Sequence, residues 1–232
     1  MLIFKNSYHG NYFCVIFVAN KFKNIKMKRV FLILPIALMT LAVSCGSEET
    51  EVHEDAVVAE NVASKDYDIS TDESVVNWSA EGVGHGHNGT IAVKSGSFTM
   101  KDDKIESGEI VIDMPSINIL SIEDEEEKGK LYGHLTTGDF FSVEEFPTAT
   151  LIITDGSDMN NVKGDLTIKD KTNEVTFALS TAEENGKLTL TTQLSVDRTK
   201  YGIIYSSGNF FEDLGDHLID DNFDFDITIV TK

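Results

Sequence analysis

The chain has 232 residues, enough for one or two domains, and 41% of them are hydrophobic, which is ordinary for a chain that buries a core. Its charge is strongly acidic, with 39 Asp and Glu against 19 Lys and Arg. Residues 1–44 hold six basic and no acidic residues, so the remainder carries 13 basic against 39 acidic residues, a net charge of −26. Such a surface repels phosphate backbones, and we predict no binding to nucleic acid.

The first predicted element is an export signal. Met27-Lys28-Arg29 precedes an apolar run over 30–43, which is the order of a secretory signal and is too short for a membrane-spanning helix. Small residues then flank Cys45, and Leu41-Ala42-Val43-Ser44-Cys45 resembles the lipobox of bacterial lipoproteins. We predict cleavage before Cys45 and its lipidation, so that the protein is lipid-anchored in the cell envelope, periplasmic or surface-exposed. Secretion without a lipid is the alternative.

Four segments follow from this reading. Residues 1–26 are interpreted as an over-called start, 27–44 as the signal peptide, 45–65 as a flexible acidic spacer and 66–232 as the folded domain. The two cysteines, Cys14 and Cys45, lie at or before the processing point. The folded domain therefore needs no disulfide and has no cysteine for a metal site.

The folded domain alternates between apolar and polar residues with a period of two, which is typical of half-buried antiparallel strands. In 161–169, for example, Val162, Gly164, Leu166 and Ile168 share one face. The strands predicted in this way, in chain order, are 75–81, 90–99, 107–114, 149–155, 161–169, 172–180, 188–196 and 222–229.

One segment, 122–137, is predicted to be helical, with Glu123–Glu127 near its start, where acidic residues favour the helix dipole. Asp155-Gly156, Lys169-Asp170-Lys171 and Glu184-Asn185-Gly186 fit tight hairpin connections. Many strands in up-and-down order indicate an all-β fold, either a closed antiparallel barrel of about eight strands or a sandwich. A barrel of this size holds packed side chains or one slender ligand.

Several short motifs occur in a definite order along this domain. They are His87-Asn88-Gly89-Thr90, Gly133-His134-Leu135 leading to Gly138-Asp139-Phe140-Phe141, Phe146-Pro147-Thr148-Ala149, Val162–Ile168, Val196–Ile203 and Asp216–Asp221. In this order and spacing the chain resembles the YceI-like family of lipid- and polyisoprenoid-binding proteins over about 66–232. The resemblance implies a lipocalin-like barrel with a helix near its mouth and a hydrophobic tunnel for an isoprenoid or similar chain.

Candidate ligand-binding residues are the inward aromatic and aliphatic side chains, with two histidines that match the family pattern. They are Trp78, His87, Ile112, Met114, His134, Phe140, Phe141, Phe146, Leu151, Phe177, Tyr201, Phe223 and Phe225. Plain core packing is the alternative for each apolar residue. We expect His87 and His134 to hydrogen-bond backbone near the helix and mouth, or a ligand headgroup. We expect Arg198 to form a structural ion pair with an Asp.

Metal and catalytic sites have little support. His85-Gly86-His87 is interpreted as a flexible turn rather than a metal-binding pair, and no second pair has ligand spacing. No nucleophile elbow or phosphate-binding glycine loop is present. We predict neither enzyme activity nor a cofactor, beyond a bound isoprenoid or quinone lipid.

The function predicted from the sequence is therefore that of an envelope lipoprotein whose barrel binds an apolar, lipid-like molecule. Its partners are that small molecule and the membrane that holds the Cys45 anchor. The alternatives are a structural or interaction lipoprotein with a filled barrel and, with least support, an enzyme using His85, His87 or His134.

Overall fold

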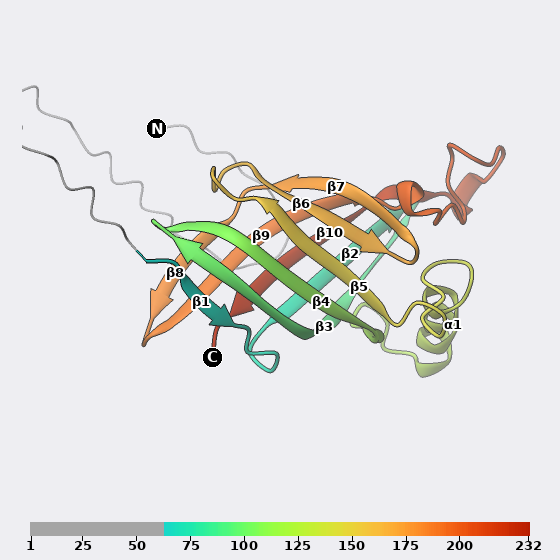
Figure 1. Ribbon diagram of the computed structural model, residues 1–232. Coiled ribbons are helices and arrows are strands. Elements are labelled where there is room, and N and C mark those ends of the chain that lie inside the picture. The colour runs from blue at the N-terminus through green and yellow to red at the C-terminus, as the bar shows by residue number, and fades with distance from the viewer. Residues whose placement is uncertain (1–62) are drawn as a thin grey trace, which may run out of the picture. The chain divides into compact units, whose positions relative to one another are not determined.

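The computed structural model describes residues 63–232, and the predictions for the start, signal peptide, Cys45 and most of the spacer lie outside these residues. Ten strands, one α-helix and two short 3₁₀ helices make up the described part (Figure 1). The 3₁₀ helices are Arg198–Tyr201 and Gly215–His217. The other elements are β1 Lys65–Asp68, β2 Val75–Gly82, β3 His85–Lys101, β4 Lys104–Ile119, α1 Glu125–Thr136, β5 Thr148–Asp155, β6 Val162–Ile168, β7 Lys171–Phe177, β8 Ser180–Glu184, β9 Lys187–Asp197 and β10 Ile219–Val230.

The strands form one curled antiparallel sheet in the order β7-β6-β5-β4-β3-β2-β10-β9-β8, with β1 paired to β3. β7 and β8 are almost one continuous run, because only Ala178 and Leu179 separate them. The β7 half pairs with β6 and the β8 half pairs with β9, so this run of chain lies at both ends of the sheet. The sheet therefore curls around an interior, as the barrel prediction required.

Some element boundaries differ from the prediction. The sheet has ten strands rather than eight, the predicted strand 172–180 is divided into β7 and β8, and β1 was not predicted. His85-Gly86-His87 begins β3 instead of forming a turn, so that prediction was wrong. The connection after Asp155 was predicted as a tight turn but extends over 156–161, because the Asp155 carboxylate accepts hydrogen bonds from the backbone N–H and hydroxyl of Ser157.

Two strands are longer than predicted because bulges shift their alternation. In β3 the buried residues are Ile91 and Val93, then Phe98 and Met100 after a register shift between Val93 and Ser95. In β4 a second irregularity surrounds Ser116, whose hydroxyl accepts from Ala92 N–H at 2.8 Å and donates to Asp113 O at 2.6 Å. A bulge turns later side chains to the other face, so inward residues continue beyond the point where a strict period of two ends.

The predicted helix is confirmed as α1, which lies at one end of the sheet in Figure 1. Asp124 caps it, because its carboxylate accepts from the backbone N–H groups of Glu126 and Glu127 at 3.0 Å each. Three acidic residues in the first turn favour the positive end of the helix dipole. No helix among residues 63–232 is long and apolar enough to cross a membrane.

Candidate ligand-binding cavity

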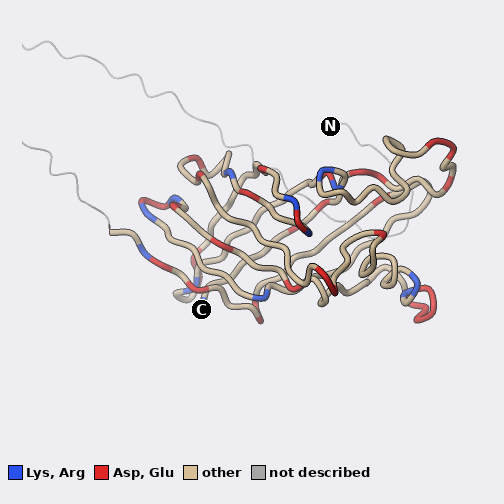
Figure 2. The backbone as a smooth tube through the Cα atoms, turned by 45° about the vertical axis from the view of Figure 1, so that its right-hand side comes forward, with Lys and Arg blue, Asp and Glu red and all other residues tan. Residues whose placement is uncertain are grey.

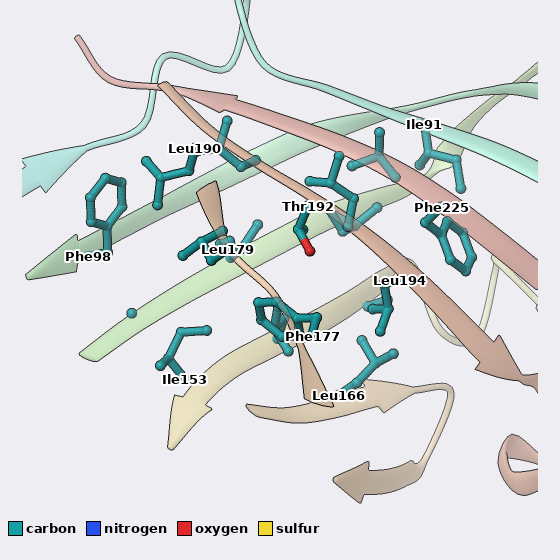
Figure 3. A pocket seen from close by; sticks show the side chains of 18 of the residues that line it. Ile91, Phe98, Ile153, Leu166, Phe177, Leu179, Leu190, Thr192, Leu194 and Phe225 are labelled. Atoms are coloured by element: carbon teal, nitrogen blue, oxygen red, sulfur yellow. The ribbon is translucent and has the colours of Figure 1, made fainter. Parts of the chain in front are cut away.

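An elongated apolar cavity lies inside the curled sheet (Figure 3). Its volume, measured as the space open to the centre of a water molecule, is about 110 Å³. One water needs only about 10–15 Å³ on this scale, so the cavity is several times larger than a single water site. Because this modest volume is spread along residues of eight strands, the space is a slender channel rather than a wide chamber.

The length of the cavity follows from β4. Ile105 and Met114 both line it and are nine positions apart on that strand. At about 3.3 Å per residue for a straight strand, the two residues lie at most roughly 30 Å apart along β4, and somewhat less because the strand is bulged at Glu106. The cavity therefore extends along most of the sheet, from Phe98 at one end to Phe141 at the α1 end.

The lining is almost entirely hydrocarbon. Thr192 is its only polar side chain, and the Thr192 hydroxyl donates to the backbone carbonyl of Gln193 at 3.3 Å. Charged residues are distributed along the turns, loops and strands (Figure 2), and none of them lines the cavity. Figure 3 shows Phe177, Leu194 and Phe225 pointing into this space from different strands. A cavity of this kind offers no hydrogen-bonding partner to a polar ligand and favours an apolar one.

The full lining comes from eight strands and the segments that follow α1 and β7. It comprises Val76, Ile91, Phe98, Ile105, Gly108, Ile110, Ile112, Met114, Phe141, Ala149, Leu151, Ile153, Leu166, Ile168, Phe177, Leu179, Leu190, Thr192, Leu194, Phe225, Ile227 and Ile229. Six candidates from the sequence lie in this set: Ile112, Met114, Phe141, Leu151, Phe177 and Phe225. Most of the others share the same alternating phase, for example Leu166 and Ile168 in β6. Following that phase along each strand, instead of selecting aromatic residues, would have found them.

Two other candidates, Trp78 and Phe223, line a small separate chamber at the α1 end. Ile91, Ile117, Leu135, Phe141 and Phe225 complete this side chamber. The space open to the centre of a water molecule is only about 10 Å³ there, which is room for about one water. Ile91, Phe141 and Phe225 also line the main cavity, so the two spaces are adjacent.

The remaining candidates lie outside both spaces. His87 Nδ1 is 3.2 Å from the Ser121 hydroxyl, and His134 Nδ1 is 2.8 Å from Asp139 Oδ2. Phe146 is half-buried and Phe140 is buried, but neither lines the cavity. Tyr201 is buried beside an outer groove between β7 and β9, where burial raises the pKa of its hydroxyl to about 12.

A cluster that we call the aromatic plug lies at the α1 end and consists of Phe140, Phe141, Phe223 and Arg198. The rings of Phe140 and Phe223 stack with centroids 6.1 Å apart, and Phe141 meets Phe223 edge-on at 6.4 Å. The Arg198 guanidinium carbon is 5.8 Å from the Phe140 ring and 5.9 Å from the Phe223 ring. These distances fit cation–π contacts and offset aromatic packing.

Arg198 is 1% exposed, and its guanidinium holds the chain around the plug together. It donates to the carbonyls of Asp220, Ile203 and Ile219 at 2.9–3.0 Å. Its Nη2 also lies 3.4 Å from Asp221 Oδ1, so the expected ion pair with an Asp is present. Burial lowers the pKa of Arg198, and the Asp221 carboxylate opposes that shift. The protein's own carbonyl and carboxylate groups therefore occupy the Arg198 guanidinium, which has a structural role and is not open to a ligand.

The histidines of β3 are adjacent but do not form a metal centre with their neighbours. The rings of His85 and His87 lie 5.9 Å apart. Partial burial and the nearby His85 lower the pKa of His87. Among residues 63–232, no group of three or more His, Cys, Asp or Glu side chains is placed to hold a metal ion.

A curled antiparallel sheet around a slender apolar channel, with one helix at the end, is the architecture of a lipocalin-like barrel. The YceI-like domain family matches residues 67–231, and the chain belongs to this family. No curated protein sequence matches the chain.

Two solved structures show the same fold. BcnA of Burkholderia cenocepacia superposes with a TM-score of 0.53 at 20% sequence identity, covering 71% of this chain and 100% of BcnA. A polyisoprenoid-binding domain from Saccharophagus degradans, implicated in plant cell wall breakdown, has a TM-score of 0.53 at 13% identity and covers 72% of this chain and 97% of its own. At these identities the likeness concerns the fold.

Proposed function

We propose that the protein binds an elongated, apolar molecule of the isoprenoid or quinone type in its central cavity and catalyses no reaction. The observation that carries the proposal is the lining, in which Thr192 is the single polar side chain along the whole channel. The polyisoprenoid-binding domain from Saccharophagus degradans supports the same ligand class, because it shares the fold.

The energetics of such binding are favourable. Each buried methylene or methyl group of an apolar chain contributes up to ~0.8 kcal/mol. A dozen buried carbons therefore offset much of an association cost of roughly 4–15 kcal/mol. The hydrocarbon tail of such a ligand has no hydrogen-bonding atom, so the wall of the cavity needs no polar side chain to hold it.

The test compares two neighbouring residues of β5. Leu151 is 9% exposed and lines the cavity, whereas Ile152 is 48% exposed on the outer face. Full-length wild type, Leu151→Trp and Ile152→Trp are purified, extracted with organic solvent and analysed by mass spectrometry for apolar molecules. We expect wild type and Ile152→Trp to release the same lipid and Leu151→Trp to release little. A wild-type protein that releases no apolar molecule contradicts the proposal.

The same variant separates the proposal from a filled, purely structural barrel. If the interior is packed, an added indole overpacks it and lowers the free energy of unfolding by about 1–3 kcal/mol. If the channel is vacant, Leu151→Trp keeps nearly wild-type stability and loses only the lipid. Urea unfolding of ligand-stripped protein measures this difference, with Ile152→Trp as the control for the substitution itself.

We further propose that Cys45 carries a lipid that holds the protein at a membrane of the cell envelope. The support is the sequence alone: a basic start, an apolar run and small residues around Cys45. Labelling of growing cells with radioactive palmitate tests it. Cys45→Ala should lose the label and leave the membrane fraction, whereas Cys14→Ala should keep both properties. Label that persists in Cys45→Ala contradicts the anchor.

A further inference from the structure

The wall of the curled sheet has an unpaired seam between β7 and β9. Neighbouring strands along the order β7-β6-β5-β4-β3-β2-β10-β9-β8 are all joined by backbone hydrogen bonds. Within residues 63–232, however, β7 pairs only with β6, and β9 pairs with β8 only over 187–191. Some Cα atoms of β7 and β9 nevertheless lie within 8 Å of one another, so the two strands are close without being joined.

The seam is tied at both of its ends. At the end near the 3₁₀ helix Arg198–Tyr201, Asn173 Nδ2 donates to Lys200 O at 3.3 Å. At the other end the chain passes from β7 into β8, where Ser180 pairs with Thr191 of β9. Between these ties, residues 192–197 leave about 17 Å of the β9 edge unpaired on the β7 side, at about 3.3 Å per residue.

The seam borders the central cavity. Phe177 and Leu179 line the cavity from the β7 side, and Thr192 and Leu194 line it from β9. Figure 3 shows these four side chains around the same space. On the outside, Leu194 also lines the groove between β7 and β9. The cavity and the outer groove therefore meet at Leu194.

Packed rings lie at both ends of the cavity. The aromatic plug fills the α1 end with stacked and edge-on rings. At the opposite end Phe98 is 3% exposed, and its ring stacks on Tyr67 of β1 with centroids 5.2 Å apart. Leu179 and Thr192 at the seam are half-buried instead. A molecule that entered through either end would have to displace aromatic rings, whereas one that entered at the seam would not.

The seam is also the part of the wall that opens with the fewest broken contacts. Parting two paired strands breaks their ladder hydrogen bonds and leaves backbone donors and acceptors without partners. β7 and β9 share no ladder, so moving them apart breaks none. The ties at Asn173 and Ser180 can stay in place while the strand edges between them separate.

We propose that the seam between β7 and β9 is the route by which the apolar ligand enters and leaves the central cavity. The strand edges part, the ligand passes between Phe177 and Leu194, and the edges close behind it. The inference rests on the proposed function and adds the path of the ligand. Because binding and release use the same route, closing it slows both rates equally and leaves the affinity unchanged.

The test locks the seam with a disulfide. Thr176 and Ser195 are exposed residues on the two rims of the groove. Thr176→Cys/Ser195→Cys is made in the full-length chain with Cys14→Ala and Cys45→Ala, so that only the introduced thiols react. Stopped-flow fluorescence measures uptake of diphenylhexatriene, a slender hydrocarbon that fluoresces once it leaves water. Displacement of the bound probe by excess geranylgeraniol, an isoprenoid alcohol, measures its release.

The control disulfide is Ile152→Cys/Asp165→Cys in the same background, which joins directly opposed residues of β5 and β6 that a ladder already connects. We expect oxidation of the seam variant to slow uptake and release by about 10-fold or more with unchanged Kd, and reduction to restore both rates. The oxidised control should keep the wild-type rates.

Two outcomes separate the inference from the function on which it rests. Wild-type rates in the oxidised seam variant overturn the inference and leave the proposed function in place. A wild-type protein that takes up no diphenylhexatriene contradicts the proposed function.

A single cysteine gives a second test that needs no disulfide to form. Thr176→Cys and Ile152→Cys, in the same background, are each labelled with a maleimide that carries a polyethylene glycol chain. Both positions are exposed, so both react with the label. We expect the label on Thr176→Cys to slow uptake by about 5-fold or more and the label on Ile152→Cys to have little effect. Equal uptake by the two labelled proteins contradicts the route through the seam.

Discussion

The two parts of the interior differ in how they are filled. Apolar side chains, most of them aliphatic, line the central cavity and leave space between them, whereas the aromatic plug packs three rings and a guanidinium closely together. The cavity has no polar group that requires a partner, apart from the Thr192 hydroxyl, which has one. In the plug, Arg198 is buried and must be fully hydrogen-bonded. The comparison teaches that close packing is concentrated at the α1 end and that free space lies in the middle, so we expect the plug to contribute most to stability and the cavity to hold the proposed ligand.

The largest expected effect comes from Arg198→Met in the plug. It removes the donor to three backbone carbonyls and leaves Asp221 near the interior without its counter-charge. We expect a loss of about 3–5 kcal/mol in the free energy of unfolding, as for other broken buried ion pairs. Urea denaturation measures it, with the exposed neighbour Lys200→Met as the control, expected within about 0.5 kcal/mol of wild type. If Arg198→Met loses no more free energy of unfolding than Lys200→Met, the plug does not concentrate stability.

A smaller and opposite effect is expected from Thr192→Val in the cavity. The exchange has nearly the same shape and replaces the only polar lining side chain with a hydrocarbon one. We expect affinity for an apolar chain to rise by about 2- to 5-fold, equivalent to roughly one added methyl contact. Calorimetric titration with geranylgeraniol measures it, and the unfolding free energy should change little. Weaker binding would mean that the hydroxyl contacts the ligand.

The smallest effect concerns pH. Burial, with the nearby His85, lowers the pKa of His87, so the unfolded chain binds the proton more readily than the folded one. Stability is therefore full above the unfolded pKa of about 6.5 and declines as pH falls from there towards the lower folded pKa. His87→Gln should flatten the dependence of the melting temperature between about pH 5 and 7.5. If the melting temperatures of wild type and His87→Gln change with pH at the same slope, groups other than His87 cause the pH dependence.

The pH dependence of ligand affinity should differ from that of stability. The cavity lining contains no titratable side chain, so affinity for geranylgeraniol should stay constant over this pH range even where stability falls.

Much of the fold was predictable because alternation is a local property of a strand. The hairpin at Glu184-Asn185-Gly186 is confirmed, with Asn185 and Gly186 at φ 53° and 80°, as a primed two-residue turn requires. The helix and its acidic first turn are confirmed as α1. The bulges near Ser95 and Ser116 were not predictable, because a bulge depends on which hydrogen bonds the neighbouring strand leaves open.

The candidate site, like the fold, was predictable from the sequence only in part. Within each strand segment between bulges, the sequence by itself determined which side chains face inward, since the pleat sends alternate residues to one side whatever the neighbours are. Only the tertiary structure decided that Phe140 and Phe223 meet in a plug, that Leu151 and Leu194 leave a channel between them, and that the Trp78 N–H has no partner. Whether inward side chains touch depends on strand register and on the curl of the whole sheet, and both arise from contacts between residues far apart in the chain.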